Sequence, residues 1–436
     1  MFLPARFYYC AIVVIACLAL GQLWPVLFYV GATLLALLAL MTLADIAMLW
    51  TRRGITATRH CNSRFSNGDD NPVSLQVDNS YPYAVRLTII DEIPHIFQRR
   101  DINFPLRLKA GETGTVDYTL RPVKRGVYSF GHIRAFASSP IGLVQRRFTC
   151  GQPTDVAVYP SYLMLGQYEF LAISNNLTEM GIKRIRRVGN NTEFEQIKPY
   201  VQDDDYRFIN WKASARTHQL MVNVYTDERS QQIINVIDKG RIMQQAFAGM
   251  TILDYAINAS LVLSYVALHR DDKAGVITFA DKFDDFVKPD RSPSQMNDIL
   301  ECLYHQNTDF AESDYSSLVT NVNHLVGQRS LLILYTNFFD YTSMLRQLPY
   351  LRQLNSHHRL LVVFFIDKER RDFINQQPSS IRGYYEHAIA AKIDHEQTLI
   401  MGTLRQHGIY SLLSTPENLS VNVINRYLEM KSRQLF

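Results

Sequence analysis

The chain has 436 residues, with 45 Lys and Arg against 41 Asp and Glu, which gives a formal net charge of +4. This length predicts two or three domains. The near balance of charges excludes the strongly basic composition of a protein that coats nucleic acid. The five scattered cysteines (Cys10, Cys17, Cys61, Cys150 and Cys302) have no C-x-x-C spacing, which indicates a reducing compartment.

Residues 1–53 predict a transmembrane helical hairpin with spans at about 7–24 and 26–46. Both spans begin with long uncharged runs, which at about 1.5 Å per residue reach roughly 27 to 29 Å, enough for a hydrocarbon core of about 30 Å. Arg6 precedes the first span, and Arg52 with Arg53 follows the second. This distribution places both termini and the body of the protein in the cytoplasm.

The alternative at the N-terminus is a cleaved signal peptide, because Ala19-Leu20-Gly21 is similar to a small-residue cleavage site. A second uncharged span follows at once, which favours the hairpin. Even after cleavage, the remaining helix with its two arginines would leave the C-terminal part inside the cell.

Residues 54–160 predict an antiparallel β-sandwich of immunoglobulin-like shape. Five to seven strands are expected from short runs with partial period-two alternation, bounded by Gly, Pro, Asn and Asp. The clearest runs are 73–80, 84–93, 113–122, 126–137 and 144–150. A sandwich by itself says nothing about function.

Residues 231–436 predict an α/β domain with a mostly parallel sheet. Apolar runs at 233–238, 274–279, 331–336, 359–366 and 409–413 alternate with helical stretches, as in sheets covered by helices on both faces. Sites in such sheets lie at the carboxyl ends of the strands, which are marked here by Asp238, by 280–281 and by Asn337.

The first of these strand ends is similar to the metal site of the von Willebrand factor A fold, where D-x-S-x-S supplies an aspartate and two hydroxyls to Mg²⁺. Asp238 stands at the aspartate position, but Gly240 and Ile242 replace the hydroxyls, and Asn337 stands where a second aspartate is expected. Because Mg²⁺ needs near-octahedral oxygen coordination, we regard Asp238 and Asn337 as a degenerate site. No cofactor is expected, and Asp238 is predicted to cap a helix or pair with a lysine.

The segment 193–216, EFEQIKPYVQDDDYRFINWKASAR, joins the two predicted domains. An arginine beside a run of aspartates favours bidentate hydrogen bonds, and a tryptophan adds a large apolar surface. No histidine or cysteine nucleophile lies within the segment. We therefore interpret it as a structural or docking seam, with a partner-binding edge alone and a catalytic site as the weaker alternatives.

The segment resembles the signature of the bacterial domain-of-unknown-function 58 family. The residues that carry the resemblance include Glu193, Phe194, Glu195, Asp204, Asp205, Arg207, Trp211 and Arg216. The resemblance implies a membrane anchor in the bacterial inner membrane, a joining segment at 161–230 and a von Willebrand A-like domain at 231–436. It also implies a link to MoxR-type AAA+ ATPases in protein assembly or maturation, with no established enzymatic activity.

We expect a non-catalytic, membrane-tethered adaptor whose partners are the lipid bilayer and cytoplasmic proteins, a MoxR-type ATPase among them. The chain has no P-loop motif and no G-x-G-x-x-G after a strand, so an ATPase would be a separate polypeptide. The alternatives are a divalent-metal-dependent hydrolase that uses Asp203, Asp204 or Asp238, and an ion-dependent ligand-binding A-domain. An adhesive A-domain outside the cell would need the opposite topology.

Overall fold

The computed structural model describes residues 1–51, 54–97, 99, 103–166, 193–202, 204, 206–226, 231–338, 340–366, 368–374, 376, 378 and 380–436. They form two compact units, Met1–Ser161 and Tyr162–Phe436. Each unit is described by itself.

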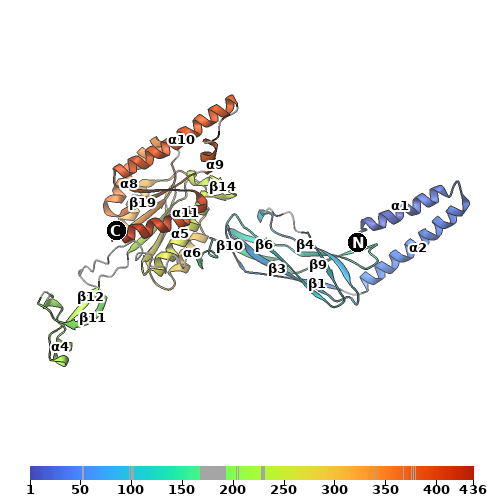
Figure 1. Ribbon diagram of the computed structural model, residues 1–436, viewed down its shortest axis with the longest axis horizontal. Helices are drawn as coiled ribbons and strands as arrows, with labels where there is room; N and C mark the ends of the chain where they lie inside the picture. Colours follow the sequence, from blue (N-terminus) through green and yellow to red (C-terminus); the bar gives the residue numbers. More distant parts are fainter. Residues whose placement is uncertain are drawn as a thin grey trace. The chain divides into compact units, whose positions relative to one another are not determined.

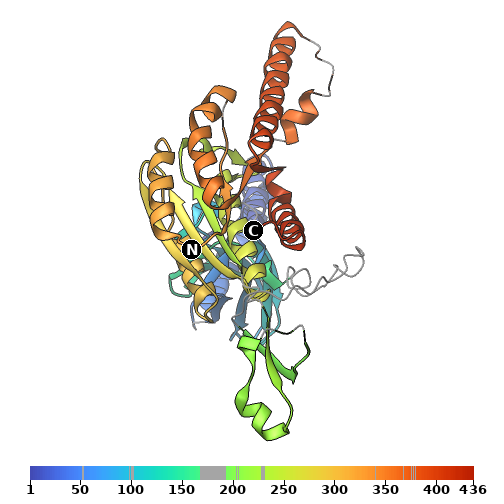
Figure 2. The same ribbon diagram turned by 90° about the vertical axis from the view of Figure 1, so that its left-hand side faces the viewer.

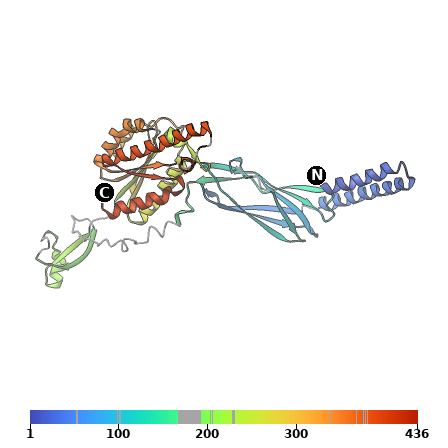
Figure 3. The same ribbon diagram turned by 45° about the horizontal axis from the view of Figure 1, so that its top comes forward.

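The first unit begins with two antiparallel helices, α1 (Ala5–Leu20) and α2 (Pro25–Trp50), which lie side by side (Figures 1 and 3). α1 ends four residues earlier than the predicted span, because the chain turns after Leu20 and Trp24 is extended before Pro25. A Cβ on Gly31 would lie 2.8 Å from the Leu18 side chain, so this glycine allows the close approach of the helices.

α2 has the length and hydropathy of a membrane span, with 6% of its apolar window buried. α5 (Ile252–His269) passes the same test of length and composition, but 72% of its window is buried. α5 is therefore a core helix of the second unit, whereas α2 remains compatible with the predicted membrane association.

The described residues of the first unit also form ten strands in three sheets, with the orders β1-β3-β6, β2-β10-β7 and β5-β4-β8-β9. Their inward side chains, such as Phe65, Leu75, Ile89 and Phe130, form one buried core. The unit also contains the 3-10 helix η1 (His95–Phe97). The strands are β1 (Ile55–Cys61), β2 (Arg64–Ser66), β3 (Asn71–Asn79), β4 (Val85–Asp91), β5 (Asn103–Leu108), β6 (Thr113–Leu120), β7 (Gly126–Phe130), β8 (Ile133–Ser138), β9 (Gln145–Cys150) and β10 (Thr154–Tyr159).

The prediction of five to seven strands was wrong for three physical reasons. The run 126–137 divides into β7 and β8, which belong to different sheets, because Glu92 binds the backbone N–H groups of Gly131 and His132 between them. β5 contains Pro105 and lies at a sheet edge, where a missing N–H donor is tolerated. β1 is rich in polar residues and gives no clear apolar run.

The end of α2 is attached to the sandwich by side chains of its loops. The hydroxyls of Tyr81 and Tyr83 donate to the carbonyl oxygens of Leu49 and Met48, at 2.7 and 2.8 Å. These carbonyls belong to the last turn of the helix, where no intrahelical donor is left. The sandwich therefore caps α2, and the two form one packed body with Leu49 fully buried.

The second unit is built on a six-stranded sheet of order β17-β16-β13-β18-β19-β20. Every pairing is parallel except that of β16 with β17. The strands are β13 (Gln232–Asp238), β16 (Lys273–Phe279), β17 (Phe283–Asp290), β18 (Leu331–Tyr335), β19 (Arg359–Phe365) and β20 (Tyr410–Ser414). Two short strands, β14 (Ala246–Phe247) and β15 (Met250–Thr251), pair with each other.

Helices cover both faces of this sheet (Figure 2). α5, α6 (Gln295–Tyr304) and α11 (Leu419–Ser432) contribute to one buried cluster. α7 (Tyr315–Leu325), α8 (Tyr341–His357) and α10 (Ile381–Gln406) contribute to the other. α9 (Lys368–Ile374) and the 3-10 helices η3 (Arg241–Gln244) and η4 (Pro416–Asn418) complete the unit.

The signature segment forms a small module of its own. β11 (Glu193–Pro199) and β12 (Met221–Thr226) pair as an antiparallel hairpin, and the connection between them carries η2 (Tyr206–Phe208) and α4 (Trp211–Thr217). The Asn210 side chain caps α4 by accepting a hydrogen bond from the backbone N–H of Ala213 at 3.0 Å, a common N-cap arrangement.

Candidate functional site

The carboxyl ends of β13 and β18 meet at one buried carboxylate, Asp238, whose side chain is 1% exposed. Its Oδ1 accepts hydrogen bonds from the backbone N–H of Gly240 at 2.8 Å and from Ser313 Oγ at 2.5 Å. Its Oδ2 accepts from Thr336 Oγ1 at 2.7 Å and from the Tyr315 hydroxyl at 3.2 Å. The two oxygens together offer about four lone-pair sites, so all of them are occupied by protein donors.

Burial raises the pKa of Asp238, and the hydrogen bonds from Ser313, Thr336, Gly240 and Tyr315 oppose this shift. The pKa of Tyr315 lies well above its ordinary value, because of burial first and the nearby Asp238 charge second. Tyr315 therefore keeps its proton and remains a donor. The cluster is a stable buried hydrogen-bond network.

The arrangement does not fit a divalent cation. Ser313 and Thr336 supply hydroxyl oxygens, but both lie in direct hydrogen-bond contact with the carboxylate, with no gap for an ion between them. Among the residues that the structure describes, no group of three or more His, Cys, Asp or Glu side chains is placed to hold a metal. Mg²⁺ needs six oxygens in near-ideal geometry, whereas the groups that contact the Asp238 carboxylate are three hydroxyls and one backbone N–H.

Gly240 shows why a hydroxyl at its position cannot contribute here. A Cβ built on Gly240 would lie 1.9 Å from Ser313 Oγ and 2.9 Å from Asp238 Oδ1. The Ser313 hydroxyl, which comes from the loop before α7, therefore fills the space of a side chain at position 240. The hydroxyl that contacts Asp238 Oδ1 thus comes from a part of the chain that is distant in sequence.

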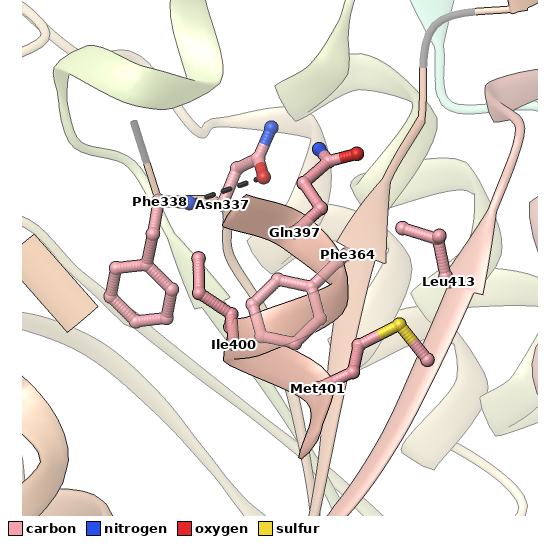
Figure 4. Close-up of a pocket in the computed structure, with 7 residues that line it drawn as sticks. All are labelled: Asn337, Phe338, Phe364, Gln397, Ile400, Met401 and Leu413. Carbon is pink, nitrogen blue, oxygen red and sulfur yellow. Dashed lines mark hydrogen bonds between the residues drawn. The ribbon is translucent and has the colours of Figure 1, made fainter. Parts of the chain in front are cut away.

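Asn337, the other predicted metal residue, does not contact Asp238. Its Oδ1 accepts a hydrogen bond from the backbone N–H of Phe338 at 3.1 Å, as Figure 4 shows. Thr336, one residue earlier, takes the position beside Asp238, because neighbouring residues at a strand end point to opposite sides. Asn337 instead lines a small pocket with apolar residues of β19, β20 and α10 (Figure 4).

That pocket holds about 10 Å³, which is near the minimum for one water molecule. It is too small for a substrate. Lys239, next to Asp238, is 3% exposed and points away from it, since its Nζ forms an ion pair with Asp284 and a 3.3 Å hydrogen bond to the Asn307 carbonyl. The predicted pairing of Asp238 with a lysine or a helix end was wrong, because three hydroxyls and the backbone N–H of Gly240 occupy its lone pairs.

The signature module presents the second candidate site. Asp204 accepts a hydrogen bond from Lys198 Nζ at 2.8 Å and another from the Val201 backbone N–H at 3.0 Å. The Lys198 hydrogen bond, followed by that of Val201, holds the pKa of Asp204 below its ordinary value. Asp204 thus forms its ion pair with Lys198, a residue that the sequence analysis did not predict as part of the site.

Five large apolar side chains of the module are exposed: Ile197 40% on β11, and Val201 59%, Tyr206 69%, Trp211 71% and Leu220 49% in the connection. Trp211 was expected to pack as part of a seam, but its indole ring is exposed in the described structure. Arg207 and Arg216 are exposed on the same connection, while Glu193, Phe194 and Glu195 lie on β11. Asp203 and Asp205 lie outside the described residues, as do the side-chain environments of these three β11 residues.

We call Val201, Tyr206, Trp211 and Leu220 the apolar tip of the signature module. Single exposed apolar residues are common on protein surfaces, whereas several on one small module indicate an interaction surface. Aromatic residues with nearby arginines are the residue types that most often dominate protein interfaces. The exposed aromatic and apolar side chains are therefore suited to contact with another protein.

Comparisons with known proteins agree with the signature. Residues 196–376 match the model of a protein family of unknown function, DUF58, which supports the predicted family. An uncharacterized Bacillus subtilis (strain 168) protein, YeaD, is 22% identical over 213 residues, which are 47% of this chain and 52% of YeaD. The chain thus spans about half the length of this curated relative.

Two solved structures show weaker similarity. One is a conserved hypothetical protein, BatB, from Bacteroides thetaiotaomicron, with 11% identity, a TM-score of 0.32 and coverage of 47% of this chain and 100% of BatB. The other is the CARDB domain of a Pyrococcus furiosus protein in complex with di-metal ions, with 13% identity, a TM-score of 0.19 and coverage of 24% of this chain and 93% of that domain.

Proposed function

We propose that the protein is a non-catalytic, membrane-tethered adaptor that binds a cytoplasmic protein through the signature module. The observation that carries the proposal is the apolar tip, with Trp211 71% exposed. A tryptophan in water forfeits the hydrophobic stabilisation that burial of its side chain would provide. A partner surface that covers the tip would recover it.

The anchor in this proposal is the pair α1 and α2. The apolar window of α2 has a mean hydropathy of 2.3, and Arg6 with the two arginines after α2 favours a cytoplasmic body in the bacterial inner membrane. Anchoring confines the partner to the membrane surface and raises its local concentration.

We identify the partner class from the family resemblance as a MoxR-type AAA+ ATPase, with a role in assembly or maturation of other proteins. In the same proposal, residues 231–436 form a von Willebrand A-like domain. The support from the residues is that the domain ends its first strand in Asp238, and that this carboxylate is held by hydroxyls and a backbone N–H.

The rival function is a metal-dependent hydrolase or an ion-dependent ligand-binding domain centred on Asp238. Any ion that binds the folded state alone raises its melting temperature by mass action. We expect millimolar Mg²⁺, Mn²⁺ or Ca²⁺ to leave the melting temperature of the full chain unchanged. A saturable rise that disappears in Asp238→Asn would support the rival.

The docking proposal is tested by affinity capture with the full-length chain in detergent and a MoxR-type ATPase in its ATP-bound state. The test variant combines Tyr206→Ala with Trp211→Ala. The matched control, Tyr384→Ala with Tyr385→Ala, removes two exposed aromatic rings from α10. We expect capture by the parent and the control and a loss of at least tenfold in the test variant, since a tryptophan or tyrosine that is a hot spot of an interface contributes about 2 kcal/mol or more.

No capture by the parent chain would contradict the ATPase assignment. Equal capture by the parent and the test variant would contradict the role of the apolar tip. Because the four substituted side chains are exposed, neither variant is expected to change the melting temperature by more than a degree or two.

A further inference from the structure

The turn between β8 and β9, residues 139–144, is the part of the sandwich to which the helical hairpin is hydrogen-bonded. Asp45 of α2 accepts hydrogen bonds from the backbone N–H groups of Leu143 and Val144, both at 2.8 Å. Phe2 exchanges two backbone hydrogen bonds with Gln145, at 2.8 and 2.9 Å. The last part of α2 and the segment that leads into α1 are therefore both fixed to this turn.

Arg6 and Arg86 converge on Gly142 in the same turn. A Cβ built on Gly142 would lie 2.4 Å from Nη2 of Arg86 and 3.6 Å from Nη1 of Arg6. Both guanidinium groups thus border the space that a side chain at position 142 would occupy. Gly142 also has a φ of 73°, a conformation that favours glycine.

Arg107 extends this group across the sheet. It is directly opposite Arg86 in the pairing of β4 with β5, so the two side chains leave the same face as close neighbours. We call Arg6, Arg86 and Arg107 the arginine cluster. Like charges placed directly opposite each other on neighbouring strands destabilise a sheet, so the arrangement calls for a compensating anion.

The described residues provide no such anion. No ion pair or hydrogen bond joins any member of the arginine cluster to another residue in this part of the chain. Asp45 of α2 is the acidic group bound to this turn. Its Oδ2 accepts hydrogen bonds from two backbone N–H groups, and its buried Oδ1 has no hydrogen-bond partner among the described residues. The first turn of α1 contains no acidic residue, and Pro4 gives it no side-chain cap, so its free N–H groups add further positive potential.

The cluster lies at the end of the sandwich from which α2 leaves. At the same end, Trp50 is 43% exposed and its ring lies 5.0 Å from the Arg146 guanidinium. Tryptophan beside arginine is typical of the membrane–water boundary. A helix pair that crosses the bilayer therefore brings the arginine cluster to the level of the lipid headgroups.

We propose that the arginine cluster is a binding site for the phosphate of an anionic phospholipid headgroup. The guanidinium group forms paired hydrogen bonds with phosphate oxygens. Two such groups lie beside Gly142, which has no side chain, and Arg107 adds a third from the strand position opposite Arg86. The site rests on the membrane anchoring proposed above but not on the docking of an ATPase. It would fix the sandwich against the membrane surface.

The test uses the full-length chain in detergent micelles, with native mass spectrometry to count bound lipids and thermal unfolding to measure stabilisation. The probes are phosphatidylglycerol, phosphatidylcholine and inorganic phosphate. The test variant carries Arg6→Gln, Arg86→Gln and Arg107→Gln. The control removes the same charge from exposed arginines of α8 and α10, as Arg346→Gln, Arg352→Gln and Arg405→Gln.

We expect phosphatidylglycerol to bind and stabilise the parent and the control more than phosphatidylcholine does. In the test variant its affinity should fall about 100-fold, since each arginine near an anionic surface contributes a factor of about five. If the triple variant does not fold, Arg107→Gln alone, on an exposed strand edge, should lower the affinity about fivefold.

Equal binding of the two lipids by the parent, or unchanged phosphatidylglycerol binding by the test variants, would overturn the site. Stabilisation by inorganic phosphate equal to that by phosphatidylglycerol would overturn the lipid source and assign a free phosphate. ATPase capture by the triple variant should match that of the parent, so failure of the lipid site and failure of the docking proposal are distinguishable.

Discussion

Substitution of Gly240 by alanine tests whether Ser313 has taken over the space of a side chain at this position. The new Cβ would lie 1.9 Å from Ser313 Oγ, far inside the sum of the van der Waals radii. The backbone of Gly240, with φ −74° and ψ 178°, suits alanine, so the cost is steric alone. Overpacking of this kind costs about 1 to 3 kcal/mol in the free energy of unfolding.

Ser313→Ala removes the obstacle together with one of the hydrogen bonds to Asp238, which by itself costs about 1.5 to 3 kcal/mol. In that background, Gly240→Ala should cost only about 1 kcal/mol, because the worst clash is gone and the next atoms, Asp238 Oδ1 and the Ala311 carbonyl oxygen, lie 2.9 and 3.2 Å from the new Cβ. The two substitutions should therefore be less harmful together than the sum of their separate effects, by about 1 to 2 kcal/mol.

The assay is hydrogen exchange of the most protected amides of β13 and β18 in the full-length chain, read by mass spectrometry, which reports the stability of this unit by itself. Gly327→Ala is the control, because a Cβ there meets nothing within 4 Å. Additivity of the two effects within about 0.5 kcal/mol would refute the reasoning.

Three further predictions concern other parts of the chain. Gly402→Ala, at an open position inside α10, should stabilise its unit by about 0.5 to 1 kcal/mol; a loss of protection in α10 would contradict this. Asp45→Ala leaves the backbone N–H groups of Leu143 and Val144 without their acceptor and should destabilise the first unit by about 2 to 4 kcal/mol, seen as faster exchange in 140–146. Because the folded-state pKa of Asp238 is raised above 3.8, its stabilising contribution is complete below that pH and is lost as the pH rises through the raised value. As the pH rises from 3.8 through the raised pKa, the free energy of unfolding of the parent should fall relative to that of Asp238→Asn. Parallel pH profiles of the two proteins would disprove this prediction.

The parallel strands were predictable because they are buried on both faces. β13, β18 and β19 are almost wholly buried and appear in the sequence as unbroken apolar runs. β17, with the sequence FDDFVKPD, lies at the sheet edge with polar residues on it. The sequence of β17 therefore contains no unbroken apolar run, and the strand was not predicted. α7 was not predicted either.

The Asp238 network was only partly predictable. The carboxylate itself was found from its place at a strand end, but Thr336 was missed in favour of Asn337, since an error of one residue changes the side of the strand. The sequence did not point to Ser313 or Tyr315 as partners of Asp238, because residues 75 and 77 positions away share no local pattern with it. The glycine at position 240 was the available signal, since it leaves space that another group must fill.

The capped end of α2 has a mechanical consequence for the first unit. β3 begins near Ser161, as Ser161 Oγ bonds Asp69 at 2.7 Å, and runs nine residues to Asn79 near Gly54. At about 3.3 Å per residue, β3 is roughly 30 Å long. Because the end of α2 is hydrogen-bonded to the sandwich, a rotation of the sandwich must turn the helix pair with it.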